Sequence, residues 1–176
     1  MQLPTLLRLL TTGAFAGCLI AVVPLHTQEL RPRTPTTVDR IIVGKSEHKL
    51  YLLADGWVIR SYDIALGRKP TGRKICKGDQ RTPEGSYIIE RHLPNSHFHL
   101  ALRISYPNAD DRRAASMVGC ETGGDIMIHG LPERYVYVGR RHTDTDWTDG
   151  CIAVTNREIE EIFAMVADGT TVEIRD

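Results

Sequence analysis

The sequence lacks an excess of charge of either sign. Lys and Arg together number 22, Asp and Glu also number 22, and the formal net charge of the 176 residues is zero. Proteins that bind nucleic acid or anionic membranes through bulk electrostatics carry a marked basic excess. We therefore expect no nucleic-acid partner, and we expect any ligand to be recognised by a local group of side chains.

The sequence also lacks the spacings that are typical of metal sites. Cys76, Cys120, Cys151, His129 and His142 carry zinc-capable side chains, but no Cys-x-x-Cys, His-x-x-x-His or His-x-x-Glu-His pattern occurs. We therefore expect no metal and no other cofactor, and a metal-dependent protein is the weaker alternative. His142 is interpreted as a solvated loop residue, with a second acid-base group as the alternative.

No apolar run reaches the roughly 20 residues that a membrane-spanning helix needs. The longest, Leu9–Leu25, follows the single basic residue Arg8 and resembles the apolar region of a secretory signal. Residues 1–30 are therefore predicted to be a signal peptide or an uncleaved N-terminal anchor, associated with the membrane before cleavage. Lipidation of Cys18 is a further alternative. In each case the following domain is expected to be exported to the periplasm or cell envelope.

One folded domain is predicted to follow. Residues 31–37 are rich in Pro and Thr and form a predicted linker, so the domain begins at Val38 and includes residues 38–176. Short β-type runs dominate it. They predict strands at residues 38–44, 48–53, 57–66, 86–90, 98–106, 125–129 and 171–174. Helices are predicted from the Asn108 cap to Met117 and over 156–166, the second opened by a Thr155–Glu158 capping box.

Cysteine pairing stays open at this point. Without the predicted signal, Cys76, Cys120 and Cys151 remain, which is an odd number. Disulfides persist outside the cytoplasm, so either one thiol stays free or all three do. A Cys76–Cys120 bridge would leave Cys151 reduced, but the sequence does not show whether the two Cα atoms approach within about 7 Å.

Two short segments carry the candidate chemistry. Cys151 directly follows Gly150, and His129 ends the predicted strand 125–129. A thiol near its free pKa of about 8.5 is mostly protonated at neutral pH, so a nucleophilic cysteine needs a base within reach. We interpret Cys151 as the nucleophile and His129 as its proton acceptor and donor. Backbone amides at Gly150 and Cys151 could stabilise an oxyanion, so acyl transfer is the implied chemistry.

A long segment, Leu131–Thr148, separates the two motifs. At about 18 residues it is longer than most connections in compact domains, and such loops are usually functional or disordered. We predict that it forms a wall of a substrate groove. Arg140 and Arg141 are candidates for gripping substrate carboxylates, with a solvated basic loop as the alternative. Thr148 and Asp149 are further substrate-binding candidates.

Gly124–Gly130 followed by Thr148–Val154 resembles the catalytic signature of the YkuD-type L,D-transpeptidases. Supporting matches are the run around Leu50-Tyr51-Leu52 and the segment Gly78–Gly85. The resemblance runs from Val38 to Ile174. It implies a mainly β fold, a YkuD-type β-sandwich with one short helix and one late helix after the catalytic cysteine, and it makes residues 38–176 the catalytic domain.

The resemblance also implies an activity. The family attacks peptidoglycan stem peptides between the third residue, a diamino acid, and D-Ala at position four. Cys151 would form a thioester while D-Ala leaves, and His129 would move the protons. Gly130 would orient the imidazole through its carbonyl, and the Gly150 amide would line the oxyanion site. Peptidoglycan stem peptides are thus the implied partner, and carbapenem-type inhibitors are expected to acylate Cys151.

Two departures leave the acceptor open. Much of the family has a second histidine where Asp149 stands and an arginine where Ala153 stands. Asp149 is expected to raise the pKa of Cys151 and to attract an amine acceptor, which favours transpeptidation. Water as acceptor would instead give an L,D-carboxypeptidase or an amide hydrolase that releases a murein-bound lipoprotein. A non-catalytic peptidoglycan-binding module is the remaining alternative.

Overall fold

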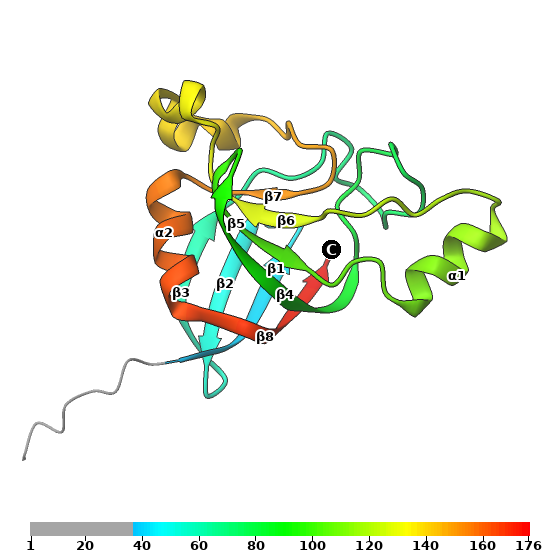
Figure 1. Ribbon diagram of the computed structural model, residues 1–176, viewed down its shortest axis with the longest axis horizontal. Coiled ribbons are helices and arrows are strands. Elements are labelled where there is room, and N and C mark those ends of the chain that lie inside the picture. Colours follow the sequence, from blue (N-terminus) through cyan, green and yellow to red (C-terminus); the bar gives the residue numbers. More distant parts are fainter. Residues whose placement is uncertain (1–36) are drawn as a thin grey trace, which may run out of the picture. The chain divides into compact units, whose positions relative to one another are not determined.

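The computed structural model describes residues 37–176, which contain eight strands, two α-helices and one 3₁₀ segment (Figure 1). The predictions for residues 1–30, including Cys18, and for linker residues 31–36 lie outside the described residues. Within residues 37–176, no helix is both long and apolar enough to cross a membrane. The elements run β1 (Val38–Gly44), β2 (Lys49–Ala54), β3 (Trp57–Asp63), β4 (Gly85–Ser96), β5 (His99–Ile104), α1 (Ala109–Met117), β6 (Met127–His129), η1 (Glu133–Asp144), β7 (Ile152–Ala153), α2 (Asn156–Met165) and β8 (Val166–Arg175).

The strands form one curled sheet in the order β3-β2-β1-β8-β4-β5-β6-β7. Most neighbours are antiparallel, whereas β1–β8 and β6–β7 are parallel. The sheet curls until Ala65, just beyond β3, pairs with Ala153 in β7, with N···O distances of 3.0 and 2.9 Å. The mainly β class, with one short helix and one late helix after Cys151, is confirmed.

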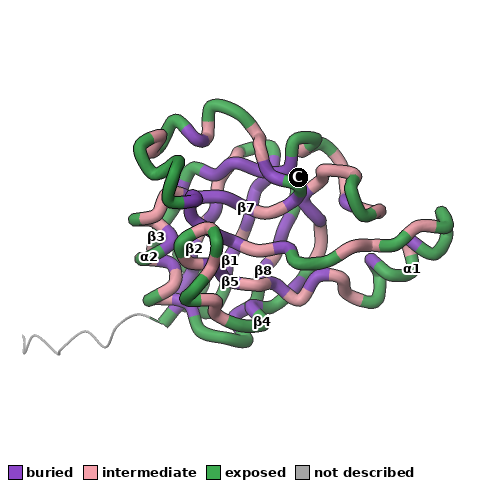
Figure 2. Tube along the Cα trace, turned by 45° about the horizontal axis from the view of Figure 1, so that its top comes forward, coloured by how far each residue is buried: buried purple, intermediate pink, exposed green. Residues whose placement is uncertain are grey.

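The core lies inside this curl. Apolar residues alternate with more exposed ones along β1 and β4, as expected for strands with one buried face. Figure 2 shows the buried chain concentrated in the strands, with exposed residues in the outer loops. Fully buried aliphatic side chains come from both halves of the sheet and from α2, and each contributes about 1.5–3 kcal/mol; they include Ile41, Leu50, Leu52, Ile89, Leu102, Ile128, Ile152 and Ile159.

Both helices begin where the sequence predicts. The Asn108 side chain accepts hydrogen bonds from the amides of Asp110 and Asp111, and Asp111 completes a capping box. The predicted box at Thr155 and Glu158 is also present and opens α2. α2 packs against the curled sheet, whereas α1 stands away from it at the end of a long excursion (Figure 1).

Most predicted boundaries differ from the structure by at most three residues, and three segments differ more. The segment 131–148 contains the 3₁₀ turns of η1, so it is not irregular throughout. β4 continues to Ser96 because it pairs first with β8 and then with β5. β8 begins at Val166 and not at 171, because Val166 already pairs with Val38 of β1; the register then shifts before Thr171 pairs with Arg40.

Candidate active site

The pairing of β6 with β7 brings the two predicted catalytic residues to one face of the sheet. Ile128 pairs with Ile152 and His129 pairs with Ala153, in parallel register. The two isoleucines are fully buried in the core, so His129 projects from the opposite face because side chains alternate along a strand. Cys151 directly precedes β7, level with Met127, and therefore lies diagonally beside His129 on that face.

The His129 ring is held in one orientation and one tautomer. Its Nδ1 lies 2.7 Å from the Gly130 carbonyl oxygen. A carbonyl only accepts hydrogen bonds, so Nδ1 carries the proton and Nε2 keeps a free lone pair. The ring stacks on Phe98 at 4.2 Å between centroids and meets the edge of Trp147 at 5.8 Å. Burial lowers the pKa of His129 to about 4, opposed by the Gly130 carbonyl.

Close packing around position 130 leaves room only for glycine. A Cβ at this position would lie 2.7 Å from Asn156 Oδ1, 2.9 Å from Ile159 Cγ2 and 3.0 Å from the Phe98 carbonyl oxygen. The Gly130 amide also donates to the Leu100 carbonyl, at 3.2 Å. These contacts fix the peptide whose carbonyl orients His129, so the packing of α2 against the strand supports the geometry of the base.

Cys151 is the free cysteine of the described chain and is half-buried. Burial raises the pKa of its thiol to about 11, the Met127 amide opposes this, and the carboxylates of Asp149 and Asp125 raise it further. The expected effect of Asp149 on the pKa is therefore present but is not the largest cause. Sγ lies 3.5 Å from the Asp125 carbonyl oxygen. The resting pair is a neutral thiol beside a neutral imidazole.

The turn before Cys151 is built from Thr148 and Gly150. Gly150 has φ +131°, and a Cβ there would lie 2.6 Å from the Arg81 carbonyl oxygen, so only glycine fits. Its amide donates to Thr148 Oγ1 at 3.1 Å, and that hydroxyl donates to the Cys151 carbonyl at 2.7 Å. Thr148 is buried, so its hydroxyl shapes the turn and is not offered to a ligand. The Gly150 amide could line an oxyanion site only if it left Thr148.

The other predicted substrate contacts separate into two groups. Asp149 is exposed and forms an ion pair with Arg68. Arg141 lines a cleft, whereas Arg140 is exposed and does not line that cleft. His142, expected to be solvated, is instead buried, and burial lowers its pKa; this expectation was wrong because η1 folds the segment inward at this residue.

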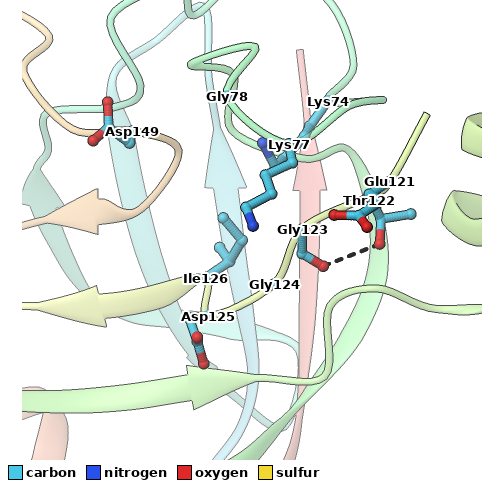
Figure 3. A pocket seen from close by; sticks show the side chains of 10 residues that line it. All are labelled: Lys74, Lys77, Gly78, Glu121, Thr122, Gly123, Gly124, Asp125, Ile126 and Asp149. Atoms are coloured by element: carbon cyan, nitrogen blue, oxygen red, sulfur yellow. Dashed lines mark hydrogen bonds between the residues drawn. The ribbon is translucent and has the colours of Figure 1, made fainter.

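Two clefts lie on either side of the pair Cys151 and His129. The arginine cleft is lined by residues that include Arg68, Phe98, Arg134, Arg141, His142 and Trp147. The mixed-charge cleft is lined by residues that include Lys74, Lys77, Glu121, Asp125, Ile126 and Asp149 (Figure 3). Phe98 and Trp147 contact His129, while Asp125 and Asp149 neighbour Cys151. The candidate pair Cys151 and His129 therefore lies between the two clefts.

A disulfide closes the wall of the mixed-charge cleft. Cys76 and Cys120 form a disulfide, with Cα atoms 5.7 Å apart. The sequence had left open whether one cysteine or all three stay free, and the structure contains the bridge. One residue further along each segment, the Lys77 amide donates to the Glu121 carbonyl at 2.7 Å. Asp79 orders the same loop by accepting hydrogen bonds from the amides of Ile75 and Cys76 and from Lys74 Nζ.

The buried neutral state of His129 predicts an acid-sensitive fold. The folded pKa of about 4 lies below the ordinary 6.5, so the stabilising contribution is complete above about pH 6.5 and is lost as the pH falls towards 4. At pH 4.5 the loss from this group is about 2.5 kcal/mol. Between pH 7 and pH 4.5, the free energy of unfolding measured in urea should therefore fall more for the wild type than for His129→Asn. An equal decrease of this free energy in the two proteins would contradict the buried neutral state of His129.

The sequence analysis did not predict that three residues surround His129 and Gly130. Phe98 was placed only at the start of a predicted strand, and Trp147 only within the segment Leu131–Thr148. Asn156 was placed only at the start of a helix, although its Oδ1 accepts the Leu131 amide at 2.6 Å beside Gly130. No motif signals these contacts, because they depend on how the curled sheet brings distant segments together. Within the described residues no group of three or more His, Cys, Asp or Glu side chains could hold a metal ion.

Comparisons with known proteins agree with this geometry. The profile of the YkuD family, described as the L,D-transpeptidase catalytic domain, matches residues 38–174. The protein named "Putative L,D-transpeptidase YafK" of Escherichia coli (strain K12) is 33% identical over 118 residues, covering 66% of this chain and 38% of YafK. The K307A mutant of Pgp2 from Campylobacter jejuni, named a helical cell shape determining protein, superposes with a TM-score of 0.58 and 27% identity over 79% of this chain and 47% of Pgp2.

A further structure shares the fold. The L,D-transpeptidase LdtMt1, solved in complex with imipenem, superposes with a TM-score of 0.50 and 17% identity over 77% of this chain and 58% of that one. The chain spans less than half the length of YafK and of Pgp2. The family match nevertheless includes every strand and helix of the described residues except the end of β8. The chain therefore belongs to the YkuD family of L,D-transpeptidase catalytic domains.

Proposed function

We propose that the chain is a cysteine acyltransferase that acts on peptidoglycan stem peptides in the cell envelope. The observation that carries the proposal is the β6–β7 register, which sets the free thiol of Cys151 beside an imidazole whose Nε2 lone pair is unused. A peptidoglycan-binding module without catalysis has no need of this arrangement. Export to the periplasm follows from the predicted signal in residues 1–30 and is part of the proposal.

The reaction proceeds in two steps. Cys151 Sγ attacks the carbonyl carbon of the third stem residue as its proton moves to His129 Nε2. The C–N bond to D-Ala then breaks, the leaving nitrogen takes the proton from His129, and a thioester remains. Because the pKa values of about 4 and about 11 disfavour a preformed ion pair, the proton moves together with C–S bond formation.

An amine acceptor resolves the thioester. It attacks the acyl carbon, loses a proton to Nε2, and forms a new C–N bond while the thiol is regenerated. Water in the same position would give hydrolysis, the second candidate, with carboxypeptidase action or release of a bound lipoprotein. The likeness to Pgp2, whose name records a role in cell shape, supports keeping hydrolysis as this second candidate.

The arginine cleft supplies the binding site for a carboxylate of the stem peptide. Arg134 and Arg141 give it positive charge, Arg68 is paired with Asp149, and aromatic side chains give the cleft apolar area. Two polar atoms among its lining residues, Trp147 Nε1 and His142 Nδ1, have no hydrogen-bond partner within the described residues. A bound ligand can satisfy such groups. We assign the carboxylate contact to Arg141, and Arg140 remains a surface residue.

Carbapenems are proposed inhibitors on the same grounds. Ring opening of a β-lactam by Cys151 uses the same attack and leaves an acyl-enzyme. The shared fold with LdtMt1, which was solved in complex with imipenem, supports this proposal.

Incubation of the purified protein with disaccharide-tetrapeptide, followed by mass spectrometry, tests the function. We expect crosslinked dimers that have lost one D-Ala. Tripeptide monomers alone, even with excess amine acceptor, would assign the hydrolytic candidate. Unchanged tetrapeptide, with Cys151 still reactive towards iodoacetamide, would contradict both transpeptidation and carboxypeptidase action.

A further inference from the structure

The mixed-charge cleft contains more charged groups than the reaction uses. Three of them are already paired within the described residues. Lys74 Nζ lies 2.8 Å from Asp79, Asp125 lies 3.2 Å from Arg103, and Asp149 pairs with Arg68. Their charges are offset inside the protein, so they are weak candidates for holding a charged ligand.

Lys77 and Glu121 remain without an ion-pair partner among residues 37–176, although both line this cleft. Both side chains are exposed, and they carry opposite charges. Figure 3 shows the Lys77 side chain extending over the cleft, with Glu121 at one side and Asp149 at the other. The cleft therefore presents one free ammonium and one free carboxylate.

The two residues are held side by side by the backbone. Lys77 follows Cys76 and Glu121 follows Cys120, so each lies one residue beyond the disulfide. The Lys77 amide donates to the Glu121 carbonyl at 2.7 Å. Gly123 lies beneath this pair, and a Cβ there would meet Lys77 Cβ and Cγ at 3.3 Å. A covalent link and a hydrogen-bonded link thus hold the backbones of the two residues side by side.

We propose that Lys77 and Glu121 determine specificity by binding a zwitterionic amino-acid centre in the side chain of the stem peptide's diamino acid. Lys77 binds the carboxylate of that centre and Glu121 binds its ammonium group. The inference rests on the proposed function, because it places this side chain in the cleft next to Cys151. A ligand carrying both charges on one carbon complements the pair, whereas a lysine side chain offers only an ammonium group.

Two peptides separate these cases. Tetrapeptides with meso-diaminopimelate or with L-lysine at position three differ by the carboxylate that Lys77 is proposed to bind. For the wild type we expect a KM at least tenfold lower for the diaminopimelate peptide, with similar kcat. Lys77→Ala should raise that KM about tenfold and leave the lysine peptide unchanged. Glu121→Gln should raise KM for both, because both side chains end in an ammonium group.

Lys69→Ala is the matched control, since Lys69 is an exposed lysine of the same loop that does not line the cleft. The Lys69→Ala protein should keep the full preference for the diaminopimelate peptide over the lysine peptide. The charge-exchanged protein Lys77→Glu/Glu121→Lys, which retains both charges in the cleft, should regain part of it. A wild type that uses both peptides with equal kcat/KM, or a Lys77→Ala protein that loses both substrates alike, would overturn the inference.

Binding to Cys151→Ala makes the inference independent of turnover. Calorimetric titration of that variant should give at least tenfold tighter binding of the diaminopimelate peptide than of the lysine peptide, and Lys77→Ala in the same background should remove the difference. Equal affinities would overturn the specificity inference even where the wild type is active. Absence of a thioester in the wild type, with the affinity difference intact, would reject the proposed function and keep the cleft assignment.

Discussion

Replacement of Cys151 by alanine is expected to abolish acylation by stem peptides and by carbapenems. In the proposed mechanism the thiol supplies the covalent step, and no other free cysteine lies in residues 37–176. The side chain is half-buried, so its removal should change the free energy of unfolding by about 1 kcal/mol or less. Mass spectrometry after incubation with imipenem should show one adduct on the wild type and none on Cys151→Ala.

His129→Asn provides the partner experiment. Asparagine can still donate to the Gly130 carbonyl, but it cannot accept the thiol proton. Acylation should therefore slow by roughly 10²–10⁴-fold, the range usual for a positioned base. An unchanged acylation rate would remove His129 from the mechanism, and an adduct on Cys151→Ala equal to that on the wild type would show that the nucleophile lies elsewhere.

Loss of the disulfide is expected to have the largest effect on stability. The bridge joins residues 44 positions apart, and closing a loop of this length restricts the unfolded chain. The chain-entropy relation gives about 4 kcal/mol for the double variant Cys76→Ser/Cys120→Ser. Denaturant unfolding of oxidised wild type and of the variant, both at pH 7, measures the difference.

The reduced wild type is the control for the substituted side chains. It should unfold at nearly the same denaturant concentration as the double variant, because both lack the same crosslink. A difference below about 1 kcal/mol between oxidised and reduced protein would show that the loop is equally restricted without the bridge. Because Lys77 and Glu121 adjoin the bridge, its loss should also weaken the preference for the diaminopimelate peptide.

Local sequence signals predicted the elements that are defined by their own residues. Asn108 and Thr155 begin their helices because their side chains accept from the amides that follow, a relation confined to a few positions. Short runs of β-type residues likewise predicted β1 and β2. These interactions are complete within one segment, so the sequence was sufficient to place them.

Elements that depend on distant partners were harder to predict from the sequence. β7 contains two residues, too few for any periodic pattern, and it exists because it pairs with β6 and with Ala65. The surroundings of the base had no local signal either, since Phe98 and Trp147 are 49 positions apart yet contact the same ring. The Gly150-Cys151 pair marked the candidate nucleophile, but only the packing shows that the Thr148 hydroxyl is used within the turn.

The closure of the sheet at β7 also restricts how a peptide can approach Cys151. β7 is last in the strand order, yet Ala153 exchanges two hydrogen bonds with Ala65 on one side, and Val154 donates to the His129 carbonyl on the other. A peptide often binds a sheet by adding a strand to an open edge. That mode is blocked here, because the backbone groups beside the nucleophile are already paired. In the proposed function the substrate would therefore lie across the ends of the strands, in contact with the side chains of the two clefts.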